Sequence, residues 1–206
     1  LGIARMRFVG SRWSKREVHG IIGGLLGTDP GAGAASTRLQ VGPVSLLTDD
    51  GYVSPPGVSI QPSDLSSGFG ATGVEFTESS LRLAYESLAP DERGEVYYRY
   101  PQQPRNLLSY RQMRFWAVAR AGSWGATGTE RLLVKVGTDA HNYYLYRMDL
   151  REAPANGVVR AADWVEGVID FEAWFRLRAA AEEVLLARPD SARAGEPVVV
   201  WSEDST

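Results

Sequence analysis

The side chains best suited to bind metal ions are few and scattered in this sequence. Only two histidines occur, His19 and His141, and cysteine is absent. The histidines lie on opposite sides of a glycine- and alanine-rich stretch, whereas a metal site needs convergent ligands with supporting contacts. Asp139 and Asn142 could offer oxygens to calcium, but their turn lacks the dense acidic run of calcium loops, and Asx side chains in turns commonly bond their own backbone. We therefore expect no metal and no cofactor.

Two pairs of adjacent carboxylates are the remaining candidates for acid/base chemistry. They are Asp49 with Asp50 and Glu182 with Glu183. Neighbouring side chains point apart on a strand or helix, so neither is a ready acid/base pair, and we expect solvated charge. The glycine-rich residues 23–27 lack the strand-to-helix setting and the Lys-Ser/Thr of a phosphate loop. With no nucleophile placed beside a base, the sequence predicts a protein that is not an enzyme.

Aromatic residues are abundant, with six tryptophans and nine tyrosines. Exposed aromatic faces on a β-sandwich can act as flat platforms for sugars. A carbohydrate site of this kind would use Tyr97, Trp116, Trp124 and Tyr143. The interpretation we prefer is that the aromatics fill a β core and its edges, because strands are enriched in such side chains.

Composition narrows the class of protein. The 206 residues are 44% hydrophobic and 23% charged, which is the ordinary globular range. The net charge of -3 offers no electrostatic footprint for nucleic acid. No stretch approaches the ~20 consecutive apolar residues of a membrane helix, so we expect a soluble segment with no direct membrane insertion. The first residues lack a signal-peptide pattern, and both ends look like cuts through a longer protein.

Several short runs have the alternating pattern of half-buried strands. They are residues 3–9, 81–86, 96–100 and 113–118, with turn-forming residues between the later ones. The β-rich runs 132–136 and 143–150 flank the polar turn 137–142 and predict an antiparallel hairpin. The two prolines within residues 52–57 favour an extended segment outside a sheet interior.

One helix is expected, over about residues 170–187. Asp170 can cap it, and Glu172 favours its positive end. Apolar residues then recur mostly at spacings of three and four, from Phe171 through Trp174 and Leu177. This amphipathic pattern predicts that one face packs on a sheet or on a neighbouring domain.

The domain organisation is predicted from a composition change near the start. Residues 20–36 are dominated by glycine and alanine, and connections longer than roughly 12 to 15 residues are uncommon inside a compact domain. We expect residues 1–50 to hold the closing strand of a preceding domain, at 3–9, followed by a linker. Residues 51–206 would then form a β-sandwich domain that is truncated at its C terminus.

Four motifs follow one another along the chain: Tyr52-Val-Ser-Pro-Pro-Gly-Val58, Ser80-Leu-Arg-Leu-Ala-Tyr-Glu-Ser-Leu88, Arg114-Phe-Trp-Ala-Val118 and Leu133-Val-Lys-Val-Gly-Thr-Asp-Ala-His-Asn-Tyr-Tyr-Leu-Tyr146. Their order resembles the SprA family of very large outer-membrane proteins of type IX secretion and gliding motility. Trp164-Val-Glu166 and the helix that follows are also similar, so the resemblance covers roughly residues 45–206. These are turn and strand patterns, and they carry over no catalytic residue.

Short strands at this spacing, with no helical pattern between them, favour a mainly β fold, a jelly-roll or galactose-binding-like β-sandwich with one C-terminal amphipathic helix. The resemblance implies a non-catalytic structural domain of a protein-export translocon, on the cell-surface or periplasmic side of the outer membrane. The expected partners are other domains of the same polypeptide, translocon subunits or exported protein cargo, and no nucleic acid. The alternative is a carbohydrate-binding jelly-roll module of a secreted or surface protein, because one fold can serve either role.

Overall fold

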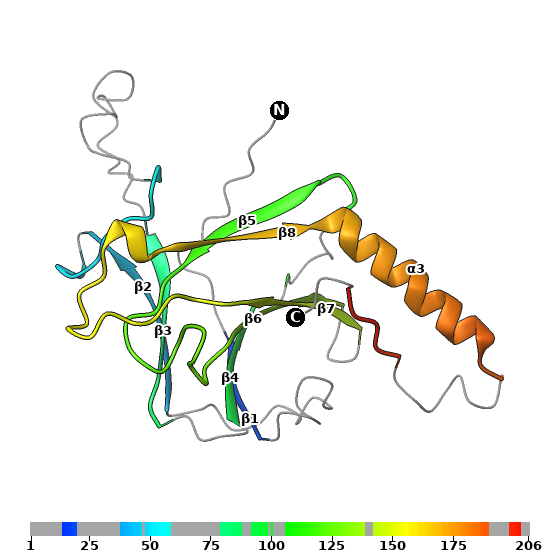
Figure 1. Ribbon diagram of the computed structural model, residues 1–206, viewed down its shortest axis with the longest axis horizontal. Coiled ribbons are helices and arrows are strands. Elements are labelled where there is room, and N and C mark those ends of the chain that lie inside the picture. The colour runs from blue at the N-terminus through cyan, green and yellow to red at the C-terminus, as the bar shows by residue number, and fades with distance from the viewer. Residues whose placement is uncertain are drawn as a thin grey trace, which may run out of the picture.

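The computed structural model describes residues 14–19, 38–46, 48–58, 79–87, 92–98, 100, 106–138, 142–189 and 198–202. This part of the chain is mainly strand, in small antiparallel sheets, with one helix towards the C terminus (Figure 1). The strand pairs within it are β1 (Ser14–His19) with β4 (Glu92–Tyr97), β2 (Leu39–Ser45) with β3 (Ser79–Tyr85), β5 (Gln112–Ala117) with β8 (Val165–Asp170), and β6 (Leu132–Gly137) with β7 (Tyr143–Met148). A short 3-10 helix, η1 (Ala161–Asp163), precedes β8, and α3 (Phe171–Ala187) follows it.

The hairpin predicted from the two β-rich runs is confirmed. β6 and β7 are antiparallel, and the last register pair joins Gly137 to Tyr143. The backbone N–H of Thr138 donates to the carbonyl of Asn142 at 3.0 Å and closes the turn. A Cβ at Gly137 would lie 2.3 Å from the Asn142 carbonyl oxygen, so the turn needs glycine at that position.

The predicted helix is also confirmed, with Asp170 as its N-cap. The Asp170 carboxylate accepts a hydrogen bond from the Glu172 backbone N–H at 3.0 Å. Phe171 and Trp174, at the start of the predicted apolar stripe, are both buried. The indole of Trp174 stacks on the ring of Tyr144, with 4.8 Å between ring centres and 5° between planes. The helix is thereby attached to the β6–β7 pair.

The best-packed core lies between the β5–β8 pair and the β6–β7 pair. Ile169 on β8 is 1% exposed, and it clusters with Phe171 and Trp174. The half-buried side chains around this cluster come from the loop before β5 and from β5, β6, β7 and α3; they are Leu107, Met113, Phe115, Val134, Val136, Tyr144, Tyr146 and Leu177. A second cluster, around Ala119, Met148 and Leu150, continues the same interior. The alternation predicted for residues 113–118 places Met113 and Phe115 in this core.

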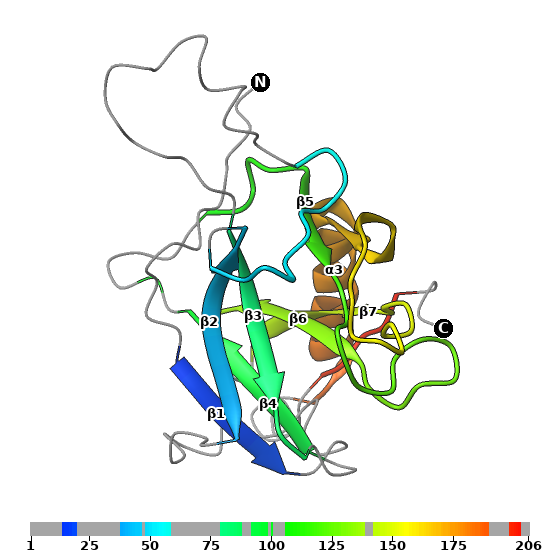
Figure 2. The same cartoon turned by 90° about the vertical axis from the view of Figure 1, so that its left-hand side faces the viewer.

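Strand pairing crosses the domain boundary expected at residue 50. β1 and β2 precede that residue, while their partners β4 and β3 follow it (Figure 2). β2 is not evident in the sequence because Gly42 and Pro43 interrupt its alternation, and β1 because its residues are largely polar. The expected strand 3–9 and the glycine- and alanine-rich residues 20–36 lie outside the described residues.

One detail of the predicted strands differs in the structure. β4 ends at Tyr97, so the alternation expected to continue to residue 100 does not form a longer strand. Tyr98 and Tyr100 are instead partly exposed and meet edge to face, 5.1 Å between ring centres.

The Pro-Pro-Gly segment is confirmed as lying outside the sheets: it leads from Tyr52 into a turn at residues 56–58.

None of the helices in the described ranges is both long enough and apolar enough to cross a membrane.

Candidate functional site

The four aromatic residues proposed for sugar binding come from different elements. Tyr97 ends β4, Trp116 lies on β5, Trp124 on the loop between β5 and β6, and Tyr143 begins β7. Trp116 packs against the cluster around Tyr52, and Trp124 against the separate cluster around Met148. Each tryptophan therefore contributes to a different part of the interior.

Trp124 and Tyr143 also have polar contacts. The Trp124 indole N–H donates to the Ala121 carbonyl at 2.8 Å. The Lys135 ammonium lies 3.8 Å from the Tyr143 ring centre, in cation–π geometry. Burial raises the pKa of the Tyr143 phenol, and the nearby Arg93 guanidinium opposes that shift. The carbohydrate-binding hypothesis for these four residues stays a prediction.

The candidate metal ligands fall largely outside the described residues. Asp139 and His141 are not described, nor is the side chain of His19. The Asn142 carbonyl accepts the hydrogen bond that closes the hairpin turn. Within the described ranges, histidine and acidic side chains form no group of three or more that could hold a metal ion.

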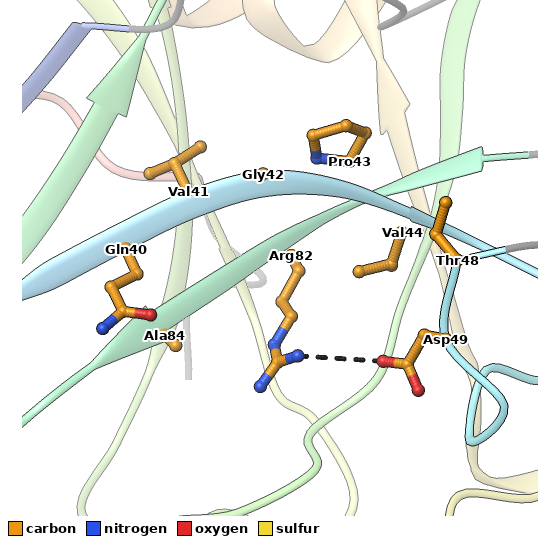
Figure 3. A pocket seen from close by; sticks show the side chains of 9 residues that line it. All are labelled: Gln40, Val41, Gly42, Pro43, Val44, Thr48, Asp49, Arg82 and Ala84. Atoms are coloured by element: carbon orange, nitrogen blue, oxygen red, sulfur yellow. Dashed lines mark ion pairs between the residues drawn. The ribbon is translucent and has the colours of Figure 1, made fainter.

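A polar hollow over β2 and β3 is the site that sequence analysis missed. It has a volume of about 340 Å³ and is partly open to solvent (Figure 3). β2 and β3 contribute seven of its lining residues, and the turn after β2 contributes Thr48 and Asp49. The strand residues are Gln40, Val41, Gly42, Pro43, Val44, Arg82 and Ala84.

The turn after β2 sets the position of Asp49. The backbone N–H groups of Thr48 and Asp49 both donate to the Ser45 carbonyl, each at 3.0 Å. The Ser45 N–H in turn donates to the Thr48 hydroxyl at 2.9 Å. The Tyr52 N–H then donates to the Asp49 carbonyl at 2.9 Å, so the backbone on both sides of Asp49 is held by hydrogen bonds.

The carboxylate of Asp49 is an ion-pair centre. One oxygen accepts from the Gly51 N–H at 2.9 Å, and the other accepts from the Arg120 guanidinium at 2.9 Å. The Arg82 guanidinium lies farther away, at 3.7 Å. The Gly51 hydrogen bond, followed by the one from Arg120, holds the pKa of Asp49 below its ordinary value of 3.8. The expectation that Asp49 is merely solvated charge is wrong, because its side chain is 19% exposed and paired with arginine.

This electrostatic setting favours binding over acid/base catalysis. A carboxylate with a lowered pKa is a weak proton acceptor near neutral pH, and both Asp49 oxygens already accept hydrogen bonds. The ion pairs of this cluster bring two guanidinium groups, those of Arg82 and Arg120, to the one carboxylate of Asp49. The arrangement is suited to hold an anionic group.

Beside the hollow, Tyr52 joins the turn to β3 and to Trp164, the residue before β8. Its hydroxyl lies 2.8 Å from the Ser80 hydroxyl, and its ring meets the Trp164 indole edge to face, 6.3 Å between ring centres. The Trp164 N–H donates to the Val53 carbonyl at 2.9 Å. Val44 lines the hollow and also packs against this cluster, so the floor of the hollow rests on core side chains.

Comparison with protein-family models, curated proteins and solved structures finds no match for this chain.

Proposed function

We propose that this chain is a non-catalytic structural module of an SprA-like protein-export translocon, in which the strand pairs form a jelly-roll or galactose-binding-like sandwich. The proposal places the module in the soluble part of an outer-membrane protein, at the cell surface or on the periplasmic side. Its partners are other domains of the same polypeptide, translocon subunits or exported cargo.

The observation that carries the proposal is that residues from different motifs of the resemblance contact one another in the structure. Tyr52 comes from the Pro-Pro-Gly motif, Ser80 from the following strand motif, and Trp164 from the segment before the helix. Tyr52 contacts both of the others, Trp164 through its ring and Ser80 through its hydroxyl, although Tyr52 and Trp164 are far apart in the chain. Buried aromatic contacts between distant segments hold a fold together. This use of the motif residues supports a framework role.

The other two motifs are used in the same way. Phe115 of the third motif meets Tyr146 of the hairpin motif edge to face, with 6.2 Å between ring centres. Val134 and Tyr144, also from the hairpin motif, pack around Ile169. Residues that are spaced for packing are what a structural module needs from its sequence.

The proposal is tested on the native protein with an antibody raised against this chain. Membranes of the source cells are fractionated, and each fraction is immunoblotted. We expect a very large polypeptide that follows the outer-membrane fraction, and loss of the band when the antibody is pre-absorbed with the purified chain. A short polypeptide, or one recovered with the cytosolic proteins, would contradict the proposal.

A further inference from the structure

The hollow over β2 and β3 exists because a glycine faces an arginine across the strand pair. Gly42 is the register partner of Arg82. A Cβ placed on Gly42 would meet no atom within 4 Å, so the space above this residue is open. In Figure 3 the Arg82 side chain extends from β3 towards Asp49, and the hollow lies between the two strands and the turn.

Arg82 reaches into this space with unused capacity to bind an anion. Its side chain is 54% exposed, and its distance to Asp49 of 3.7 Å exceeds an ordinary hydrogen bond. Asp49 itself is already bound at 2.9 Å by Arg120 and by the Gly51 backbone. The carboxylate is therefore a poor competitor for the guanidinium, which can present two parallel N–H donors to another carboxylate.

The rest of the lining fits a polar, extended ligand. Gln40 and Thr48 supply neutral hydrogen-bonding groups. Ala84 and Gly42 carry no bulky side chain, so they leave space above the two strands. The attraction for an anion is local, because the whole chain carries a net charge of -3. The net negative charge of the chain would repel an acidic ligand, so binding must depend on this cluster.

We propose that this hollow binds an acidic, extended segment of a partner protein, with one carboxylate of that segment paired to Arg82. A partly open hollow buries too little of a small anion to hold it by one exposed arginine, since the cost of immobilising the ligand is not offset. A peptide adds contacts on both sides of the carboxylate, along the strands. The site goes beyond the proposed function, because it depends on the local geometry and not on membership of a translocon.

The test is fluorescence anisotropy of the whole 206-residue chain with a labelled peptide of alternating glutamate and serine. A peptide with glutamine in place of glutamate is the matched ligand control. We expect the glutamate peptide to bind more tightly, and Arg82→Gln to weaken that binding by about fivefold, the upper range for an exposed ion pair.

Two further variants separate the hollow from net charge. Arg176→Gln changes the net charge equally, but Arg176 lies on α3, away from the hollow, in an exposed pair with Glu172 (Figure 1). It should bind the peptide as the parent does. Gly42→Val places a branched side chain in the hollow without changing charge, and it should weaken binding while the melting temperature is maintained.

Four results would each overturn the inference. The first is that the parent chain binds the glutamate and glutamine peptides equally well, and the second is that the substitutions at Arg82 and Arg176 weaken binding equally. The third is that Gly42→Val binds the glutamate peptide as tightly as the parent does. The fourth is that free glutamate, at an equal concentration of carboxylate, displaces the peptide completely. The last result would identify a small-anion site and not a peptide site.

Discussion

The β5–β8 pair and the β2–β3 pair each place a glycine opposite a long side chain, with opposite results. On the β5–β8 pair, Gly167 faces Phe115, and a Cβ on the glycine would lie 2.5 Å from the ring. On the β2–β3 pair, Gly42 faces Arg82, and the space above the glycine is open. The aromatic ring covers its glycine and closes the core, whereas the guanidinium turns to Asp49 and leaves a hollow.

The difference between the pairs shows how one local pattern serves two purposes. Ile169 on β8 is 1% exposed, while the Arg82 side chain on β3, at the hollow, is 54% exposed. The β5–β8 pair is thus part of a packed interior, and the β2–β3 pair retains accessible surface. Binding residues are commonly carried by such accessible parts on a rigid support. We therefore propose a framework role for the first region and a binding role for the second.

The largest effect is expected from Trp174, at the centre of the packed region. The substitution Trp174→Ala removes a buried indole and its stacking on Tyr144, and it should lower the free energy of unfolding by about 3 to 5 kcal/mol. Chemical denaturation of parent and variant measures this difference. Phe175→Ala is the matched control on the same helix, because Phe175 is 39% exposed and should cost far less. Similar losses of unfolding free energy for both variants would show that the Trp174 side of α3 is no better packed than the Phe175 side.

A smaller effect is expected from the helix cap. Asp170→Ala removes the acceptor for the Glu172 N–H, and it should cost about 1 kcal/mol of stability, as other N-cap truncations do. Asp170→Asn keeps an acceptor oxygen and should recover most of that loss. Urea unfolding followed by far-ultraviolet circular dichroism tests both variants, and a loss of the same size in the asparagine variant would rule out the capping role.

The smallest effect concerns Asp49, which makes the same local hydrogen bond as Asp170 but lies beside arginines. Because its pKa is lowered in the folded protein, the unfolded chain binds a proton more readily as pH falls. The stabilising contribution of Asp49 is therefore complete above its ordinary pKa of 3.8 and is lost as pH falls below it, through the lower folded pKa.

The substitution Asp49→Asn tests this acid dependence. The melting temperature of the parent should exceed that of the variant at neutral pH, by a small amount, and the gap should narrow as the pH falls below 3.8. Thermal melts across the acid range measure the gap. A gap that widens in acid would contradict the ionised, arginine-paired state of Asp49.

Local patterns made part of the fold predictable. The β6–β7 hairpin and α3 follow from alternation around a polar turn and from the apolar spacing after Asp170, and both depend on nearby residues. The β5–β8 pair depends on residues far apart in the chain, and its register gives no short-range pattern. β2 carries Gly42 and Pro43, residues that are unfavourable in strands, so its place in a sheet comes from its partner β3.

The candidate site was harder to predict than the fold. Asp49, Arg82 and Arg120 come from a turn, a strand and a loop, and nothing in their spacing connects them. Asp49 followed by Gly51 after the strand was the available indication, because an aspartate often accepts from a backbone N–H two residues ahead. The aromatic residues drew attention by their number, although Trp116 and Trp124 contribute to packing.

At Gly167 an aromatic ring occupies the space that a Cβ would need, whereas at Gly42 that space is open. This contrast is tested most directly by placing valine at both positions. Gly167→Val must displace the ring of Phe115, and it should lower the free energy of unfolding by about 1 to 3 kcal/mol, the usual cost of overpacking. Gly42→Val enters open space on a strand, so its melting temperature should equal or exceed that of the parent. Equal destabilisation by the two variants in parallel thermal melts would show that the space above Gly42 is closed, and would contradict the division into a packed framework and an open binding surface.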